Sequence, residues 1–350
     1  MTNDKACYGV IGAGSFGTAI ANILAANGNV LVYTRNQAVF DCIKNGEMHR
    51  NHILPPNVYP TMLLEEVCQK CQLIFPVVPS SNFREMMRNA APHLKPNHIL
   101  IHCTKGLNVE LPDGRDYEVG TPLRKDAICT MSRIIREESL VMRIGCLSGP
   151  NLAKELAEGQ LAATVIASRF DEVIHKGQNA LKSDRFRVYG SSDVLGVELA
   201  GVLKNIMAIA AGMLNGMGMG ENAKSLLVSR GLGEMVKLGR ALGASTRSFL
   251  GLAGVGDLVA TCSSVLSRNF RVGKGLAEGK DLDFIIEEMK EVAEGVNTVK
   301  LAKGISLQYG IDLPIVDTLY DVLYNGVPIE KAILNLMNSP LDVDADFWLT

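Results

Sequence analysis

Short apolar runs recur through the first half of the chain and alternate with segments whose apolar residues follow helical spacing. The runs of strand length are residues 6–11, 30–33, 73–79, 99–104, 142–147, 162–167 and 186–189. Strands that alternate with helices are typical of a parallel sheet covered by helices on both faces. The pattern therefore predicts a doubly wound α/β domain, which we place at residues 1–190.

The second half has a different pattern, because runs of strand length stop after Tyr189 and segments such as 223–243 and 284–292 keep helical spacing. We therefore expect an all-α domain at residues 191–350. The length of 350 residues agrees with two domains, since one domain typically has about 100–200 residues. The polar segment 110–125 predicts a surface loop.

A glycine motif follows the first predicted strand directly, Gly12-Ala13-Gly14-Ser15-Phe16-Gly17, and a helical pattern follows it at residues 18–27. In this strand–turn–helix setting Gly12 permits the tight turn, Gly14 lets backbone N–H groups approach a pyrophosphate, and Gly17 lets the helix pack on the strand. The helix start also favours an anion. The motif predicts a dinucleotide site, with a glycine-rich turn that binds nothing as the alternative.

The end of the second predicted strand bears on which dinucleotide binds. A NAD-specific site usually has an acidic residue here, about 20 residues after the first glycine, which holds the ribose 2′-hydroxyl. This chain has Arg35 instead. Because a guanidinium can hold a 2′-phosphate, Arg35 favours NADP(H). An arginine stacked on the adenine and a solvated loop residue are the other interpretations, so NAD(H) and NADP(H) both stay open.

The stretch 196–212 is typical of a buried helix, yet it carries Lys204 and Asn205 in its middle. An ammonium in an apolar helix costs several kcal/mol unless it has a partner or a task. No histidine follows His175, so the second half lacks the usual general base of lactate- or malate-type dehydrogenases. We therefore predict that Lys204 transfers the proton. A structural Lys–Glu pair and a lysine whose amine reaches solvent are the alternatives.

Polar residues follow the predicted strands at the edge where ligands of open α/β sheets bind. Lys105 follows the strand 99–104, and Gly149 and Asn151 follow the strand 142–147. We expect these three residues to face one site. For Lys105 the alternative is an ordinary surface lysine at the start of a loop.

Two segments of the second half carry further candidates. Gly254-Val255-Gly256-Asp257 predicts a tight turn into a helix, in which Asp257 is either a site residue or only an N-cap. Ser267-Arg268-Asn269 opens another helix. Its N–H groups, guanidinium and polar side chains predict a site for a phosphate-sized anion. A surface salt bridge is the alternative for Arg268.

The amino-acid composition indicates which classes of binding partner we do not expect for this chain. With a net charge of −2 and 21% charged residues, the chain has no basic excess that would favour nucleic acid or an anionic membrane. The longest apolar run, 206–214, is shorter than the about 20 residues that a membrane span needs. Eight cysteines scattered through apolar segments predict a reduced, cytoplasmic chain. No second pair at ligand spacing accompanies Cys68 and Cys71, so we expect no metal site.

Taken together, these motifs resemble the NAD(P)-dependent glycerol-3-phosphate dehydrogenases of bacterial type. Besides the glycine motif, the resemblance rests on Lys105-Gly106-Leu107, Ser148-Gly149-Pro150, Lys154-Glu155, Leu203-Lys204-Asn205, Arg230-Gly231-Leu232, Gly256-Asp257-Leu258, Thr261-Cys262 and Ser267-Arg268-Asn269. The order and spacing agree over about residues 7 to 335. The segment 110–126 departs from the family in being longer.

The resemblance implies reversible interconversion of sn-glycerol 3-phosphate and dihydroxyacetone phosphate with NAD(H) or NADP(H). It further implies a supply of glycerol phosphate for phospholipid synthesis and a homodimer. By position, it makes Lys204 the proton acceptor. The substrate positions are Lys105, Gly149, Asn151, Lys204, Asp257, Ser267, Arg268 and Asn269. The cofactor positions, with Gly12, Gly14 and Gly17 of the motif, are Ser15, Phe16, Arg35, Lys105, Ala153, Arg268, Val292 and Glu294.

On this interpretation hydride leaves C2 of the substrate for the nicotinamide while neutral Lys204 takes the hydroxyl proton. Burial and the charge of Lys105 would favour the neutral amine and lower its pKa, whereas a nearby Asp257 or Glu198 would oppose this. Lys105 and Asn205 would polarise the carbonyl oxygen. The expected catalytic residues are therefore Lys204, Lys105, Asn205 and Asp257.

Two other functions stay open. A β-hydroxyacid or sugar-acid dehydrogenase also joins a dinucleotide domain to a helical domain with a catalytic lysine. In those enzymes the asparagine follows the lysine several positions later, whereas Lys204 and Asn205 are adjacent. A cofactor-sensing protein without turnover would keep the glycine motif but has no need of Lys204, Asp257 and Arg268 together.

Overall fold

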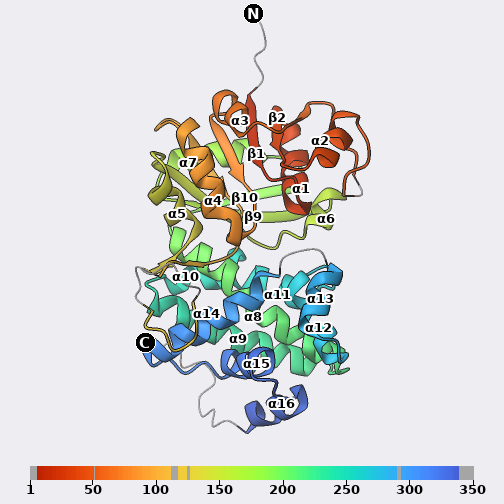
Figure 1. The fold of residues 1–350 in the computed structure, drawn as a ribbon, viewed down its shortest axis with the longest axis vertical. Coiled ribbons are helices and arrows are strands. Elements are labelled where there is room, and N and C mark those ends of the chain that lie inside the picture. Colours follow the sequence, from red (N-terminus) through yellow and green to blue (C-terminus); the bar gives the residue numbers. More distant parts are fainter. Residues whose placement is uncertain (1–5, 51, 112–116, 124–126, 290–292, 339–350) are drawn as a thin grey trace, which may run out of the picture. The chain divides into compact units, whose positions relative to one another are not determined.

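The chain divides into two compact units in a computed structural model that describes residues 6–50, 52–111, 117–123, 127–289 and 293–338. Unit 1 comprises Met1–Lys105 and Thr130–Glu198, and unit 2 comprises Gly106–Cys129 and Leu199–Thr350. The division differs from the expected boundary at residue 190, because unit 1 extends to Glu198 and Gly106–Cys129 groups with unit 2. Each unit has its own set of elements (Figure 1).

In the described part of unit 1, eight strands form one sheet in the order β10-β9-β8-β5-β4-β1-β2-β3. They are β1 Cys7–Ile11, β2 Asn29–Tyr33, β3 Val58–Thr61, β4 Leu73–Pro76, β5 Ile99–His102, β8 Arg143–Ser148, β9 Ala162–Ser168 and β10 Phe186–Ser191. The helices are α1 Ser15–Ala25, α2 Gln37–Lys44, α3 Leu64–Lys70, α4 Ser80–Ala90, α5 Met131–Glu138, α6 Ala153–Ala157 and α7 Asp171–Leu181. The predicted α/β class is confirmed.

The two faces of the sheet are covered by different helices. Val10 and Phe75 point to a core that contains side chains of α1 and α7, such as Leu24 and Val173. Helix α4 contacts both α3 and α5, and these three helices form a separate group. Successive strand residues point to opposite faces of the sheet, and helices bury both faces. This explains why the strands are continuous apolar runs instead of alternating ones.

One pair of strands contradicts the expectation of a parallel sheet, because β8 and β9 are antiparallel. The short helix α6 connects them. Its five residues rise only about 7–8 Å, which is too little to carry the chain back along a strand of about 20 Å. The chain therefore turns at the edge of the sheet and returns in the opposite direction.

A second difference is β3, which the apolar pattern did not predict. The strand Val58–Thr61 pairs with β2 at one edge of the sheet, with Pro60 opposite Val32. Proline cannot donate to a ladder, so it is tolerated where one side of the strand has no neighbour. The run is short and half-exposed, so the apolar signal is weak.

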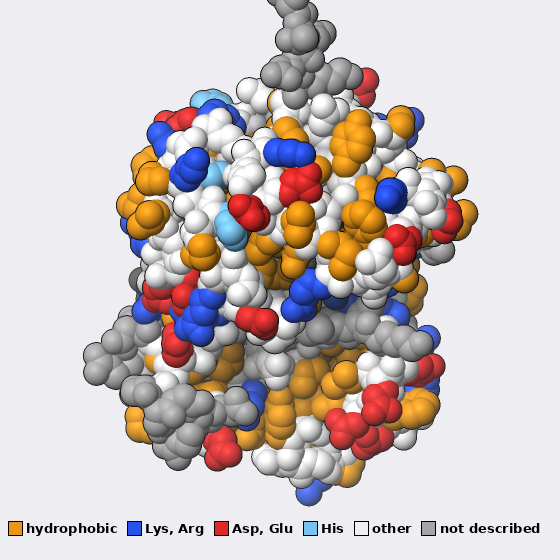
Figure 2. Space-filling view, turned by 45° about the horizontal axis from the view of Figure 1, so that its top comes forward, with side chains coloured by type: hydrophobic (Ala, Val, Ile, Leu, Met, Phe, Trp, Pro, Cys, Tyr) orange, Lys and Arg blue, Asp and Glu red, His pale blue; other side chains and the backbone are white. Residues whose placement is uncertain are grey.

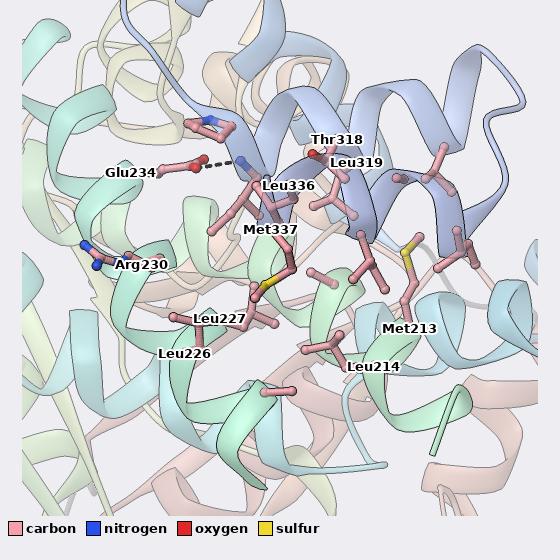
Figure 3. Close-up of a pocket in the computed structure, with 18 of the residues that line it drawn as sticks. Met213, Leu214, Leu226, Leu227, Arg230, Glu234, Thr318, Leu319, Leu336 and Met337 are labelled. Carbon is pink, nitrogen blue, oxygen red and sulfur yellow. Dashed lines mark hydrogen bonds between the residues drawn. The ribbon is translucent and has the colours of Figure 1, made fainter. Parts of the chain in front are cut away.

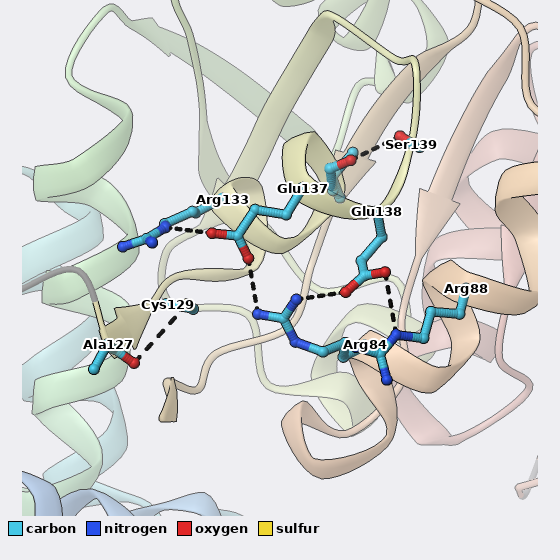
Figure 4. A network of polar contacts seen from close by, with 9 residues as sticks. Arg84, Arg88, Ala127, Cys129, Arg133, Glu137, Glu138 and Ser139 are labelled. Carbon is cyan, nitrogen blue, oxygen red and sulfur yellow. Dashed lines mark hydrogen bonds and ion pairs between the residues drawn. The ribbon is translucent and has the colours of Figure 1, made fainter. Parts of the chain in front are cut away.

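Helices α4 and α5 of unit 1 are joined by charged side chains (Figure 4). Arg84 on α4 forms ion pairs with both Glu137 and Glu138 on α5, and Arg88 adds a 3.1 Å pair with Glu138. Arg84 is 11% exposed, and Arg133 forms a further pair with Glu137. A partly buried network of this kind fixes two helices better than isolated surface pairs do.

Unit 2 is helical apart from a two-stranded antiparallel ribbon in its described residues, β6 Asn108–Val109 with β7 Ile128–Cys129. Its helices are α9 Glu221–Ala241, α10 Thr246–Leu250, α11 Asp257–Ser263, α12 Arg268–Ala277, α13 Leu282–Met289, α14 Glu294–Tyr309, α15 Pro314–Tyr324 and α16 Ile329–Met337. The predicted helices 223–243 and 284–292 correspond to α9 and α13, although residues 290–292 lie outside the described residues.

Helix α8, Val194–Gly216, begins in unit 1 and continues into unit 2. By length and composition it is apolar enough to cross a membrane, but 83% of its most apolar window is buried inside the protein. Such burial is typical of the core helix of a globular protein.

The segment after Lys105 is not the simple surface loop that its polar sequence predicts. Leu111, Tyr117 and Leu123 are buried. Tyr117 packs so closely on α14 that a Cβ at Gly304 would lie 1.6 Å from its hydroxyl oxygen. The apolar residues within this polar stretch therefore attach it to unit 2, while residues 112–116 and 124–126 lie outside the described part of the chain.

Candidate active site

The candidate residues of unit 1 follow the carboxyl ends of four parallel strands. The glycine motif follows β1, Arg35 follows β2, Lys105 follows β5, and Gly149 and Asn151 follow β8. These strands and β4 pair in parallel. Their carboxyl ends therefore share one edge of the sheet, which is where open α/β sheets bind ligands.

Each glycine of the motif has a different physical reason to be glycine. Gly12 has a φ of 115°, and a Cβ there would lie 2.5 Å from the carbonyl oxygen of Val77. A Cβ at Gly17 would lie 1.9 Å from the carbonyl oxygen of Gly12, so α1 can pack against the turn only without a side chain there. A Cβ at Gly14 would meet no atom within 4 Å. Gly14 therefore leaves open space in front of the N-terminus of α1.

Ser15 and Phe16 are the first residues of α1, and α1 has no acidic residue in its first turn. Ala153 begins α6, which packs against α1. Ala13, Phe16 and Ala153 contact the same apolar core. Arg35 is exposed directly after β2. The expected cofactor positions of unit 1 thus lie around the glycine turn and its neighbouring strand.

His49 contacts this turn from a distant segment, and the sequence did not reveal that contact. Its Nε2 lies 2.9 Å from the carbonyl oxygen of Ala13, and the residue is buried. Since a carbonyl only accepts, Nε2 carries the proton and donates. The contact steadies the carbonyl between Gly12 and Gly14, and the spacing of His49 from the motif gives no local signal for it.

Lys105 and Gly149 are brought together as expected. The Lys105 Nζ donates to the carbonyl oxygen of Gly149 at 3.0 Å. Gly149 is buried with a φ of 153°, and a Cβ there would lie 3.1 Å from the Cα of Thr164. The Asn151 amide lies 2.8 Å from the Thr164 hydroxyl. Lys105 is half-buried, so its amine is held at the strand ends instead of extending into solvent.

The central polar group of unit 2 consists of Lys204, Asp257 and Thr261. The Lys204 Nζ donates to Asp257 Oδ1 and to Thr261 Oγ1, each at 2.6 Å. The side chains of Lys204 and Asp257 are 8% and 2% exposed. Asp257 and Thr261 stand one turn apart on α11, so both face α8. That i, i+4 spacing is the signal by which Thr261 is detectable in the sequence.

Asp257 is therefore an ion-pair partner of Lys204 in addition to opening a helix. The N-cap of α11 is Gly256, and a π-helical turn, Leu252–Gly256, leads into it. A Cβ at Gly254 would lie 2.0 Å from the carbonyl oxygen of Phe249. The turn thus depends on glycine, and π-helical turns are frequent where a side chain is aimed at a functional site.

Glu198 is not the partner of Lys204. It binds residues of unit 1 instead. Its carboxylate accepts from the backbone N–H and the hydroxyl of Ser132 at 2.9 and 2.6 Å. His102 Nε2 lies 2.9 Å from it. Burial alone would raise the pKa of Glu198, but the contacts with His102 and Ser132 outweigh burial and lower the pKa. The structural Lys–Glu pair considered from the sequence is thus excluded for this glutamate.

Ser267, Arg268 and Asn269 lie at the start of α12 as predicted. The Ser267 hydroxyl accepts from the N–H of Phe270 and caps the helix, and Arg268 is exposed at the first helical position. Asn269 is buried, and its Oδ1 accepts from the N–H of Gly295 at 2.9 Å. Asn269 therefore fastens the start of α14, where Glu294 is the first residue.

Helices α8 and α12 approach each other through glycines. A Cβ at Gly212 would lie 2.0 Å from the carbonyl oxygen of Phe270, and a Cβ at Gly273 would lie 1.8 Å from that of Ile209. Backbone contacts on both sides leave no room for a side chain. Because α8 carries Lys204 and α12 carries Arg268, this crossing sets the spacing between the helix segments that carry these two residues.

Two of the remaining predicted residues, Asn205 and Glu294, belong to α8 and α14. Asn205 is buried beside Lys204 on α8, and a Cβ at Gly295 would lie 2.7 Å from its carbonyl oxygen. Glu294 is half-buried. Val292 lies outside the described residues. Within the residues that the structure describes, no group of three or more His, Cys, Asp or Glu side chains is arranged to hold a metal.

Comparisons with known proteins cover both halves of the chain. The model for the N-terminus of NAD-dependent glycerol-3-phosphate dehydrogenase matches residues 8–174, and the model for its C-terminus matches residues 193–334. The glycerol-3-phosphate dehydrogenase of Alcanivorax borkumensis, named as NAD(P)+-dependent, is 40% identical over 100% of this chain and 98% of its own. That of Ectopseudomonas mendocina is 42% identical over 97% and 96%.

Solved structures agree with this result. The crystal structure of glycerol-3-phosphate dehydrogenase from Coxiella burnetii is 29% identical, with a TM-score of 0.85 over 96% of this chain and 99% of that one. The ketopantoate reductase of Ralstonia eutropha shares the fold at 14% identity and a TM-score of 0.57. The matching models span both units, and the relatives match nearly end to end. The chain therefore belongs to the NAD-dependent glycerol-3-phosphate dehydrogenase family.

Proposed function

We propose that the protein interconverts sn-glycerol 3-phosphate and dihydroxyacetone phosphate with NAD(H) or NADP(H). The observation that carries the proposal is the buried contact of Lys204 with Asp257 and Thr261, at 2.6 Å to each. A buried lysine held by a carboxylate and a hydroxyl can transfer a proton, and the resemblance to this family makes Lys204 the proton acceptor. The matched relatives carry the same activity in their names.

The glycine turn fits a dinucleotide. Gly12 and Gly17 permit the turn, and Gly14 leaves open the space in front of the N–H groups of α1. We assign Ser15 and Phe16 to the same cofactor, together with Ala153 at the start of α6. From unit 2 we assign Arg268, Glu294 and Val292. When bound, the nicotinamide cofactor accepts or supplies the hydride at C2 of the substrate.

Lys204 moves the proton at the oxygen of C2. Asp257 stabilises the ammonium form, which is the form that donates a proton when the ketone is reduced. In the oxidation of the alcohol, neutral Lys204 takes the hydroxyl proton. Thr261 accepts from the same amine and fixes its direction. We assign Lys105 and Asn205 to the polarisation of the carbonyl oxygen, because an ammonium and an amide both stabilise negative charge that develops there.

The phosphate of the substrate is assigned to the start of α12. Arg268 and the N–H groups of the first turn supply the positive end of a helix and a guanidinium. Ser267 and Asn269 complete this group, and we place Gly149 and Asn151 among the substrate residues as well. The binding energy of the phosphate would orient C2, which makes it useful to catalysis and not only to affinity.

Arg35 supports NADP(H) over NAD(H). It is exposed directly after β2, where the 2′ position of the adenosine ribose is normally recognised. We further propose that the protein is a cytoplasmic homodimer and that its glycerol phosphate supplies phospholipid synthesis. Figure 2 shows Lys and Arg side chains interspersed with Asp and Glu on the face that it presents, as expected for a protein that binds its anions locally.

The proposal is tested by following the absorbance of NADH and of NADPH with dihydroxyacetone phosphate as substrate. We expect turnover with at least one of them and much slower turnover with unphosphorylated dihydroxyacetone. A 2-keto acid such as ketopantoate serves as the comparison substrate, since a structural neighbour carries that activity in its name. Faster reduction of the keto acid would overturn the assignment, and binding of NADPH without turnover of any of the three would indicate a cofactor sensor.

A further inference from the structure

Two cysteines of unit 1, which the assigned site does not use, lie in contact with each other. Cys7 is the first residue of β1, and Cys71 follows the last residue of α3. Their Sγ atoms are 3.2 Å apart, although 64 positions separate them in the sequence. Both are free thiols. Since the sulfur atoms of a disulfide lie about 2.05 Å apart, these two would have to approach by only about 1.2 Å.

The contact follows from the close packing of α3 on β1. A Cβ at Gly9 would lie 2.6 Å from Cγ1 of Val67 and 3.3 Å from the Cβ of Cys71. Gly9 stands two positions after Cys7, so both residues belong to the same face of the strand. The missing side chain at Gly9 therefore lets the end of α3 approach the strand beside Cys7. The two sulfur atoms are held by a strand and by the end of a helix, not by a surface loop.

The two thiols differ in exposure and in acidity. Cys7 is half-buried, whereas Cys71 is only 1% exposed. The hydrogen bond from Cys71 lowers the pKa of the Cys7 thiol from its ordinary value of 9.0 and outweighs burial, and Lys70 has a smaller effect in the same direction. The contact with Cys7, together with burial, raises the pKa of the Cys71 thiol. Cys7 is therefore the thiol that ionises first and that a small reagent can reach.

We propose that Cys7 and Cys71 form a reversible disulfide when the protein meets a low-molecular-weight disulfide such as oxidised glutathione. The Cys7 thiolate attacks one sulfur of the reagent, which forms a mixed disulfide and releases a first thiolate. The Cys71 sulfur then loses its proton and attacks Sγ of Cys7, which forms the protein disulfide and releases a second thiolate. The two released thiolates take up the two protons that the cysteines lose. One reagent disulfide is thus reduced as one protein disulfide forms.

Two other cysteines provide matched controls for this pair. The spacing of Cys68 and Cys71 is that of a redox motif, but Cys68 is buried on α3, and burial raises the pKa of its thiol to about 11. Cys42 on α2 is half-buried like Cys7, and its thiol donates to the carbonyl oxygen of Met48 at 3.3 Å. Cys68 is therefore the control for position and Cys42 the control for exposure.

The disulfide would change the stability of unit 1 and leave the assigned reaction unchanged. Cys7 begins β1, whereas the glycine turn follows the other end of this strand, about 17 Å away at the rise of a strand. A bond across 64 positions lowers the entropy of the unfolded chain. We expect the oxidised protein to melt about 5–15 °C above the reduced protein. Dithiothreitol should restore the lower melting temperature.

The test treats the full-length protein with oxidised glutathione and maps its peptides by mass spectrometry without reduction. Peroxide is a poorer reagent, because it also oxidises methionine. Met337, for example, is 65% exposed in a groove of 1020 Å³ in unit 2 (Figure 3). We expect a peptide pair linked through Cys7 and Cys71, which disappears after treatment with dithiothreitol.

Four variants separate the roles of the two thiols. Cys71→Ser should stop the reaction after its first step, so glutathione stays on Cys7. Cys7→Ser should leave Cys71 unmodified, because Cys71 is buried. Cys68→Ser and Cys42→Ser should form the same linked peptide as the wild type. Circular dichroism checks that each variant folds, and the peptide map of the wild type decides whether the bond forms without any variant.

Three results would overturn the proposal. The first is a wild-type protein in which Cys7 keeps glutathione or stays unmodified, since Cys71 would then not complete the reaction. The second is a linked peptide that contains Cys68 in place of Cys7. The third is an oxidised protein that melts no higher than the reduced one, because the folded backbone would then not accommodate the bond. None of these measurements depends on enzymatic turnover, so a failure of the assigned reaction would leave them unaffected.

Discussion

Lys204 on α8 and Asp257 on α11 form a buried ion pair, with 2.6 Å between Nζ and Oδ1, across 53 positions of sequence. Neither charge is exposed enough to be solvated by bulk water. Removing one partner from such a pair leaves the other charge buried without compensation. The pair is therefore the group on which the proposed chemistry depends most.

Lys204→Ala removes the proposed proton donor. We expect kcat to fall by about 10²–10⁴-fold, the usual loss for a general acid or base, with cofactor affinity nearly unchanged because the glycine turn belongs to unit 1. Steady-state kinetics and fluorescence titration with NADPH measure the two effects. Lys303→Ala is the matched control, since Lys303 forms a more exposed pair with Asp317. A variant that keeps a tenth or more of wild-type kcat would exclude the role.

Asp257→Asn keeps the shape of the aspartate and removes its charge. The ammonium of Lys204 then loses its stabilising partner, so deprotonation becomes easier. We expect the rising limb of kcat against pH for glycerol phosphate oxidation to move to lower pH. The reduction of dihydroxyacetone phosphate at neutral pH should slow. An unchanged profile, matching the control Asp317→Asn, would show that Asp257 does not govern the charge of Lys204.

Arg268→Ala should damage the use of dihydroxyacetone phosphate far more than the use of dihydroxyacetone, because only the former has the phosphate that we assign to the guanidinium. The loss of a charge-assisted hydrogen bond corresponds to about a 10- to 150-fold decrease in kcat/KM for the phosphate ester. Arg271→Ala on the same helix is the control. Equal losses for both substrates would mean that Arg268 serves the fold or the cofactor instead.

Arg35→Asp exchanges attraction for repulsion at the ribose 2′ position and supplies an acceptor for a 2′-hydroxyl. We therefore expect weaker binding of NADPH and equal or better binding of NADH. Isothermal titration with each cofactor gives the ratio of the two affinities. Lys44→Asp makes the same charge change at the end of α2. If Arg35→Asp changes the ratio no more than this control does, Arg35 does not contact the ribose.

Glu234 provides a prediction about stability against pH. Burial raises its pKa to about 8 from an ordinary value of 4.5, despite the N–H groups of Ile315 and Val316. A raised pKa means that the folded state holds a proton that the unfolded state has released. The contribution of Glu234 to the free energy of unfolding is therefore present below about pH 4.5 and is lost as the pH rises to about 8.

Glu234→Gln tests this, because glutamine does not titrate. We expect the wild type to lose stability relative to the variant between these pH values, with a slope of at most about 1.4 kcal/mol per pH unit. Urea unfolding at several pH values measures the difference. A constant difference between the two proteins across this range would contradict the raised pKa.

The glycine turn was predictable from the sequence because its requirements are local. The left-handed φ of Gly12 and the close packing at Gly17 exclude other residues within one turn of chain, so the motif reveals the geometry. The strand β3 was not predictable in the same way, since Pro60 and a half-exposed edge position leave little apolar signal. The direction of β9 depends on the short α6, which the apolar pattern of the strand itself does not encode.

Within the candidate site, the partner of Lys204 is likewise a feature that the local sequence does not determine. Glu198 is a residue of the same helix and was as good a candidate from the sequence as Asp257. The choice depends on His102 and Ser132, which occupy Glu198, and such contacts between distant segments are not visible in local spacing. Similarly, the polar composition of residues 110–125 predicted a surface loop, although Tyr117 and Leu123 within it are buried.

The glycine crossing of α8 and α12 has a consequence for which molecules the enzyme accepts. The gap between the amine of Lys204 and the start of α12 is fixed by backbone against backbone at Gly212 and Gly273. Under the proposed assignment, this gap limits the length of a substrate between its reacting oxygen and its phosphate. We expect an added methyl group at Gly273 to push the helices apart and to favour a longer carbon chain. The proposed preference for chain length would then depend on Gly212 and Gly273, two residues that we do not assign to the substrate.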